Sequence, residues 1–519
     1  RWRPQAPTCY PHDLAKSPKK SFANCALLVG TTFLCIGVSS GAPSPAKTTV
    51  LESDSITVLG CRAIDGYEGD CANEVGNRWV DFTDNGEVTW NVTSPKVNRY
   101  RVVVAFGSFT GGETFEISSA SSTIKGEVHE TMGLYDNELQ KKHPKNLERF
   151  QLDQVLEIQK GQQTVSFRID RAQGKTPFKL ELIELVPVDH EAAIAKEQAK
   201  AERQRANTDW FVDAKYGVMF HWTTETLPLK GETKSYQEAV RDFDVPAFAE
   251  MVELTGAKYV FFTAMHIDPT FPAPIKEWEQ VFPGMTTERD LISEISEALG
   301  KRNIKLGLYF ASGPMAKNLD GSKSVSVDEN AYTERVAKLF IAVGKRYGSK
   351  LSAYWIDNWL GVDRWYPTFN YERYFEALKA GNPQRIIGLN SNIEVSVTPW
   401  QEFWAGEATG DPRALPGGRY YQRGPAKGLQ RHGLIHLESA WVHSTRKMKP
   451  SDPRYALIGK ASIPIEPPKY TEGKLIDFIQ GFNENDGVLT INIKISQEGQ
   501  ISDQALGLMK KVRLRFRGQ

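Results

Sequence analysis

From Trp210 onward, the chain alternates strand-like apolar runs with amphipathic stretches, and this alternation restricts the fold more than any other feature. Repeated β–α units over about 300 residues are typical of a doubly wound sheet or of a (β/α)₈ barrel. No glycine-rich phosphate-binding fingerprint opens a helical stretch, which disfavours a nucleotide-binding sheet. We therefore predict an α/β fold with a TIM-like (β/α)₈ barrel over residues 208–519. The strand-like runs are Tyr216–His221, Tyr259–Thr263, Lys305–Phe310, Ala353–Ile356, Arg385–Leu389, Leu434–Leu437 and Val488–Ile493.

The region before the barrel, residues 48–187, alternates apolar and polar residues in short runs that turn residues separate. Examples are Arg78–Phe82, Val88–Val92 and Thr164–Ile169. This period-two pattern predicts an antiparallel β-sandwich domain. Between the two domains, residues 188–207 include a charged, alanine-rich stretch with few apolar positions, which predicts a solvated linker helix.

Residues 1–47 have the pattern of a secretory signal peptide and leader. Lys16, Lys19 and Lys20 precede the apolar run Ala26–Val38, and small residues follow that run. The run is shorter than the roughly 20 residues that a membrane-spanning helix needs. An uncleaved N-terminal anchor is the alternative. We expect a secreted or periplasmic protein whose mature chain has no membrane span.

Of the five cysteines, Cys61 and Cys71 lie beyond this N-terminal segment. An even pair in an oxidising compartment predicts a structural disulfide between them. Two cysteines without accompanying histidines make a poor zinc site. We expect neither a metal nor an organic cofactor.

Charge and composition narrow the class of partner. Lysine and arginine total 64 against 63 aspartate and glutamate, which gives a formal net charge of +1. Because nucleic-acid affinity comes largely from a basic surface, we expect no nucleic-acid partner. Apolar residues make up 40% and charged residues 24% of the chain, as in an ordinary soluble protein.

Polar and aromatic residues gather where the strand-like runs end, which is where barrel enzymes build their active sites. His221 ends the first run, and His266 and Asp357 lie just after the second and fourth runs. Glu407 follows Trp404 in a further region, Pro399–Glu407, between the fifth run and Leu434–Leu437. Two histidines, two carboxylates and several tryptophans are typical of a sugar-cleaving site. Taken singly, each residue also has a structural interpretation, since a tryptophan can be core and Asp357 can cap a helix.

Several segments resemble, in chain order, the barrel motifs of the family 29 glycoside hydrolases, the α-L-fucosidases. The resemblance implies a retaining exo-glycosidase that acts on α-L-fucosides of an oligosaccharide or polysaccharide. It implies Asp357 as the nucleophile and Glu407 as the acid/base residue. The resembling segments are Trp210–Trp222, Gly256–His266, Arg289–Tyr309, Tyr354–Asp357, Glu402–Glu407 and Asn485–Ile493. The substrate-binding residues that it implies are His221, Trp222, His266, Tyr309, Trp355 and Trp404.

The chain departs from the family pattern around the sugar. Ile267 follows His266 where the family has a second histidine, and Asn390–Asn392 occupies the stretch where it has an arginine. Glu238 is only an approximate match to a glutamate of the first loop. The same mechanism on a related or substituted deoxy-sugar is therefore an alternative, as is a barrel that binds glycans without cleaving them. The N-terminal sandwich resembles carbohydrate-binding modules of the jelly-roll kind.

Overall fold

The computed structural model describes residues 48–51, 56–60, 79–131, 147–171, 178–319, 326–366, 369–392, 394–395, 398–405, 418–422, 426–446, 448, 451–458 and 462–518. Residues 47–519 form one compact unit. The predicted signal segment, both cysteines of the predicted disulfide (Cys61 and Cys71) and Glu407 lie outside the described residues. Among the helices that are described, none has the length and apolar character to cross a membrane.

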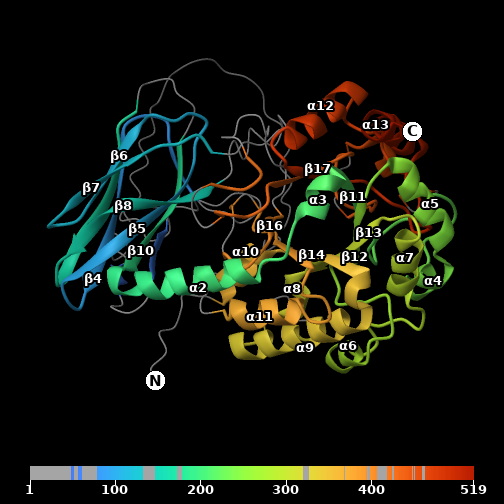
Figure 1. The fold of residues 1–519 in the computed structure, drawn as a ribbon, viewed down its shortest axis with the longest axis horizontal. Coiled ribbons are helices and arrows are strands. Elements are labelled where there is room, and N and C mark those ends of the chain that lie inside the picture. Colours follow the sequence, from blue (N-terminus) through green and yellow to red (C-terminus); the bar gives the residue numbers. More distant parts are fainter. Residues whose placement is uncertain are drawn as a thin grey trace, which may run out of the picture. The chain divides into compact units, whose positions relative to one another are not determined.

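The N-terminal region is a sandwich of two sheets (Figure 1). Pairing within both sheets is antiparallel, except that β1 pairs with β4 in parallel. Trp90 and Tyr100 are fully buried in the core between the sheets. The predicted antiparallel sandwich is confirmed. One sheet has the order β1 (Thr48–Val50), β4 (Gly86–Ser94), β9 (Gly161–Ile169), β6 (Thr114–Ser118), β7 (Thr123–Glu127). The other has β2 (Thr57–Gly60), β10 (Phe178–Pro187), β5 (Asn98–Gly107), β8 (Glu148–Ile158), and β3 (Val80–Phe82) also pairs with β10.

Eight parallel strands form the barrel that the alternating pattern predicts. Neighbours along the sheet pair in parallel register, and a parallel bridge between Phe403 and Gln430 joins its two ends. In chain order the strands are β11 (Tyr216–Phe220), β12 (Tyr259–Met265), β13 (Lys305–Ala311), β14 (Leu351–Asp357), β15 (Ile386–Leu389), β16 (Phe403–Trp404), β17 (His432–His436) and β18 (Val488–Asn492).

Helices surround these strands (Figure 1). Side chains cap several of their N-termini; Asp290 accepts from Ser293 N–H, and Asp328 accepts from Ala331 N–H. The helices and 3₁₀ turns are η2 (Val188–His190), α2 (Glu191–Gln204), α3 (Asp209–Ala214), α4 (Tyr236–Asp242), α5 (Val245–Thr255), α6 (Lys276–Val281), α7 (Leu291–Gly300), α8 (Ser312–Met315), α9 (Glu329–Tyr347), η3 (Gly348–Lys350), α10 (Trp359–Trp365), α11 (Tyr371–Leu378), η5 (Pro453–Leu457), α12 (Glu472–Asn483) and α13 (Asp503–Arg517).

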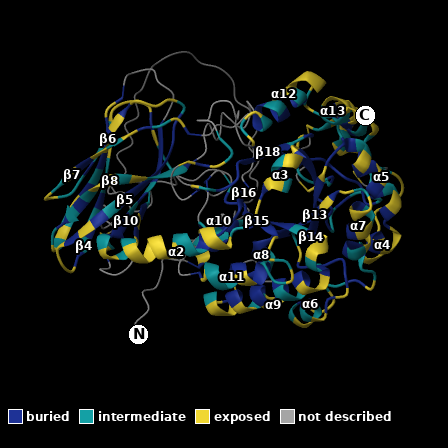
Figure 2. Ribbon diagram, viewed as in Figure 1, coloured by how far each residue is buried: buried dark blue, intermediate teal, exposed yellow. Residues whose placement is uncertain are grey.

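Alternate side chains of each strand face opposite layers, and this separates two apolar cores. Phe261, Trp355 and Phe403 pack inside the barrel. Phe262 and Tyr354, their neighbours in sequence, pack instead in the layer between strands and helices. Figure 2 shows the barrel strands mostly buried, while the helices around them carry exposed residues. Along each strand, odd and even positions thus face opposite layers, and we call this alternation parity. Only residues of the inward-facing parity can reach a site in the barrel mouth.

Glu402, which precedes β16, connects the linker to strand β15 and to the end of helix α11. Its carboxylate accepts hydrogen bonds from the backbone N–H of Ala206 (2.9 Å) and Ile387 (2.8 Å), and it also pairs with Lys379. The Glu402 side chain is only 1% exposed.

Glu402→Ala should lower the free energy of unfolding by about 3–5 kcal/mol, because it leaves the Lys379 charge and two buried N–H groups without this acceptor. Urea denaturation would measure the loss. The matched control is Glu372→Ala, which removes a half-exposed pair with Lys200 and should cost less than about 1 kcal/mol. Equal losses in the two variants would contradict a structural role specific to Glu402.

Candidate active site

A small pocket opens at the carboxyl ends of the barrel strands. Its lining comes from several neighbouring strands, so closure of the barrel brings together residues far apart in sequence. The lining residues are His221, His266, Tyr309, Trp355, Asp357, Asn390 and Trp441. Five of these, all but Asn390 and Trp441, are among the site residues that the sequence predicts.

Asp357 ends β14, and its carboxylate accepts hydrogen bonds from two side chains. The Tyr309 hydroxyl donates to Oδ2 at 2.5 Å, and the Asn390 side-chain amide donates to Oδ1 at 2.6 Å. The Ser312 hydroxyl also donates to the Asp357 carbonyl oxygen at 2.8 Å. Hydrogen bonds to an ionised acceptor are short and strong, so one donor on each oxygen fixes the plane of the carboxylate. Asp357 is half-buried, which leaves it open to the pocket.

His221 is held in a single orientation. Its Nδ1 lies 2.7 Å from Asn492 Oδ1, while the amide nitrogen of Asn492 donates to the Trp441 carbonyl at 3.1 Å. Because the Asn492 oxygen is then an acceptor, His221 Nδ1 carries the proton and Nε2 is the acceptor. Burial, together with the neighbouring His266, lowers the pKa of His221 well below its usual 6.5. The ring is therefore neutral and can accept from a hydroxyl.

His266 faces the pocket because of a β-bulge. The register of β12 against β13 shifts between Thr263 and Met265, so Met265 pairs with Phe310 and packs in the outer layer. The extra residue reverses the parity, and His266 consequently faces inward. Its ring stacks on Tyr309 at 5.7 Å between centroids and lies 5.5 Å from His221.

Trp441 and Asn390 are site residues that the sequence interpretation missed. Trp441 follows β17 and packs against His221 (4.9 Å between centroids) and His436 (3.8 Å). Trp441 lies in no strand-like run, so periodicity gives no signal for it. Asn390 directly follows β15, and its position at a strand end could have identified it.

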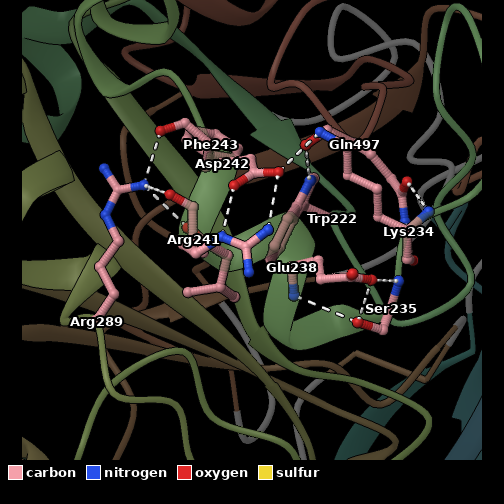
Figure 3. A network of polar contacts seen from close by, with 10 residues as sticks. Trp222, Lys234, Ser235, Glu238, Arg241, Asp242, Phe243, Arg289 and Gln497 are labelled. Carbon is pink, nitrogen blue, oxygen red and sulfur yellow. Dashed lines mark hydrogen bonds and ion pairs between the residues drawn. The ribbon is translucent and has the colours of Figure 1, made fainter.

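Trp222 and Trp404, predicted to contact the sugar, lie outside this pocket. Trp222 follows the inward-facing His221, so its ring turns outward and packs against Phe243 and Phe262. The Trp222 indole N–H donates to the Gln497 carbonyl in a structural network that includes Glu238 (Figure 3). Glu238 is exposed there and accepts from the Ser235 N–H in the capping box of α4.

Trp404 follows the inward-facing Phe403 and is likewise turned outward. It is fully buried in a separate cluster with Tyr421 and Leu429. Parity therefore explains both tryptophans, since each is the immediate neighbour of a residue that faces the barrel interior.

Sequence comparison identifies the family that this barrel resembles. Residues 232–399 match the family model described as Alpha-L-fucosidase. The human tissue alpha-L-fucosidase is 31% identical over 132 residues, which cover 19% of this chain and 28% of the relative. The mouse tissue alpha-L-fucosidase is 30% identical over 132 residues, covering 19% and 29%. The match thus spans less than a third of these relatives. The segment that matches the family model, residues 232–399, contains His266, Tyr309, Trp355, Asp357 and Asn390.

Solved fucosidase structures also align with part of this chain. Alpha-L-fucosidase isoenzyme 1 from Paenibacillus thiaminolyticus aligns with a TM-score of 0.43 and 18% identity, covering 61% of this chain and 77% of that one. Alpha-L-fucosidase AlfC from Lactobacillus casei aligns with a TM-score of 0.40 and 16% identity, covering 60% and 98%. Residues 232–399 are thus similar to the alpha-L-fucosidase family, and part of this chain is similar to the curated tissue alpha-L-fucosidases.

The His221 geometry predicts one tautomer and one charge state. ¹⁵N NMR of the imidazoles should show Nδ1 protonated and Nε2 unprotonated at neutral pH, and the pKa of His221 should lie well below the usual 6.5 because burial disfavours the cation. Asn492→Asp is the matched control, since a carboxylate at the same position should raise the pKa of His221 and bring its titration into view. An imidazolium in the wild type at pH 6 would contradict the assignment.

Proposed function

We propose that this alpha-L-fucosidase-like barrel hydrolyses terminal α-L-fucosides by double displacement. The observation that carries the proposal is Asp357, a carboxylate at the fourth strand end, oriented by Tyr309 and Asn390 inside a pocket with two histidines. A carboxylate held in this way is a suitable nucleophile, because orientation lowers the barrier of the attack.

In the first step an Asp357 oxygen attacks the anomeric carbon while the bond to the leaving oxygen breaks. That oxygen needs a proton, and we assign its delivery to Glu407. In the second step Glu407 takes a proton from water, the water oxygen attacks the same carbon, and the ester to Asp357 breaks. Two inversions give net retention at the anomeric carbon.

The pocket supplies groups for the sugar itself. His221 Nε2 accepts from a hydroxyl, and His266 lies beside it at the same rim. Trp355 and Trp441 present apolar surface, which suits the less polar face of a deoxy-sugar. The pocket thus combines hydrogen-bonding groups with apolar surface, which suits the terminal sugar of a glycan.

A related or substituted deoxy-sugar is the second candidate. Ile267 follows His266, and Asn390 binds the nucleophile, so the contacts to the sugar differ from the family pattern while the attacking carboxylate is present. A panel of aryl glycosides, headed by the α-L-fucoside, separates the two candidates by which glycoside is cleaved. Binding of fucosylated glycans without any cleavage would instead indicate a non-catalytic barrel.

Asp357→Asn should reduce kcat on the cleaved glycoside by about 10⁴-fold or more, since it removes the attacking carboxylate. The measurement is release of the aryl group, followed by addition of azide, which should restore turnover by replacing the nucleophile. Asp213→Asn, an exposed substitution before β11 at the opposite end of the barrel, is the control and should retain full activity. Wild-type rates in Asp357→Asn would refute the assignment.

Glu407→Gln should lower kcat/KM on substrates with poor leaving groups by about 10²–10⁴-fold and spare kcat/KM on those with good ones, because kcat/KM reports the first step and only poor leaving groups need a proton there. Glu438→Gln is the matched control. Glu438 follows β17 and is fully buried, and burial raises its pKa to about 8. Its neutral isostere should therefore keep wild-type rates. The reverse result, with Glu438→Gln selectively slow on poor leaving groups, would move the acid/base role to Glu438.

A further inference from the structure

Arg149 of the sandwich strand β8 lies buried between acids from both domains. Its guanidinium donates to Glu184 of β10 at 2.5 Å and pairs with Glu394 of the barrel. The side chains of Arg149, Glu184 and Glu394 are 12%, 13% and 2% exposed. A planar guanidinium can donate to two carboxylates in fixed directions. A lysine ammonium in its place would hold their orientation less well.

The backbone reinforces this junction. Leu147, just before β8, forms a parallel bridge with Glu394, and the Val395 N–H donates to the Leu147 carbonyl at 2.8 Å. The sandwich thus holds residues 394–395 through both a side-chain ion pair and a main-chain hydrogen bond.

From Glu394, a short run of hydrogen bonds leads back to the nucleophile. Glu394 N–H donates to the Ser391 carbonyl at 3.2 Å, and the Ser391 hydroxyl donates to the Glu394 carbonyl. The Asn390 side-chain oxygen accepts from Asn392 N–H at 3.2 Å. The amide nitrogen of Asn390 consequently turns toward Asp357, to which it donates at 2.6 Å.

Helix α10 also contacts Asn390, through the Trp359 N–H. Asp363 of α10 is half-buried, and the charges of Arg149 and Glu394 both act on it. Burial raises the pKa of Asp363, and Arg149 opposes that rise. Helix α10 follows Asp357 directly, and its first residue, Trp359, donates its N–H to the Asn390 carbonyl at 2.9 Å.

We propose that Arg149 is a positioning residue for the nucleophile Asp357, acting through Glu394 and the turn of residues 390–392 on the Asn390 amide. The inference rests on the proposed function for its catalytic consequence. It makes the sandwich a part of the active-site framework, since the side chain that anchors the turn comes from β8.

The test compares Arg149→Met with Arg101→Met in the full chain. Arg101 is another sandwich arginine; it pairs with Glu191 of the linker helix at 2.6 Å, and among the described residues it has no contact with 390–392 or 394–395. On the aryl glycoside that the wild type cleaves, kcat per folded molecule of Arg149→Met should fall about 10–100-fold with KM within about twofold, because misplacement of a reacting group by about 1 Å costs up to about 100-fold. Arg101→Met should match the wild type.

Arg149→Lys tests the proposal if the methionine variant folds poorly. It keeps the charge but not the bidentate fork, so kcat should fall by a smaller factor, between the wild type and Arg149→Met. Wild-type kcat in the folded fraction of Arg149→Met or Arg149→Lys, however much either variant is destabilised, would overturn the proposal.

A readout without turnover separates this inference from the proposed function. The side-chain ¹⁵N–¹H signals of Asn390, identified by their absence in Asn390→Ala, should shift in Arg149→Met and stay unchanged in Arg101→Met. If the wild type cleaves none of the glycosides and these signals still shift, the proposed function fails while the positioning contact stands. Unchanged Asn390 signals in Arg149→Met would overturn the inference whatever the activity.

Discussion

Closure of eight parallel strands into a barrel is the constraint on which the site depends. It forces every second side chain of each strand into the interior, so residues with the same parity at successive strand ends converge. Asp357, Asn390 and Asn492 follow this rule on β14, β15 and β18. His266 reaches the same pocket only because the bulge in β12 inserts one residue and reverses its direction. The chemistry of the mouth is thus set by register as much as by residue type.

Much of the architecture could be predicted from the sequence, because alternating patterns of different period mark the sandwich and the barrel. Strand ends also identified His221, His266, Tyr309, Trp355 and Asp357, which the structure brings into one pocket. The sequence predicts sugar contacts for both His221 and Trp222. Because neighbours in a strand face opposite layers, only His221 lies in the pocket. Trp441 was beyond prediction, because its position depends on a long-range contact with His221 rather than on local pattern. The signal peptide, the disulfide and sugar binding by the sandwich stay predictions.

Two of the buried ion-paired groups lie at different junctions of the molecule. Glu402 joins Lys379, Ala206 and Ile387, and so ties the linker to the barrel wall far from the strand ends that form the site. Arg149 joins Glu184 and Glu394 next to the turn that carries Asn390. Buried charges are costly unless they are well paired, so their retention at a domain junction is most simply explained by the orientation that they impose. Glu402 thus connects the linker to the barrel, and Arg149 connects the sandwich to the barrel.

The central claim is that Asp357 forms a covalent ester with the sugar. Incubation of the wild type with an activated 2-deoxy-2-fluoro-fucoside, followed by peptide mass spectrometry, tests it most directly, because the fluorine slows hydrolysis of the intermediate by destabilising the cationic transition state. We expect the mass of one fluorosugar on the peptide that contains Asp357, and loss of the adduct on incubation with water. An adduct on another carboxylate, or cleavage with inversion and no adduct, would contradict the account.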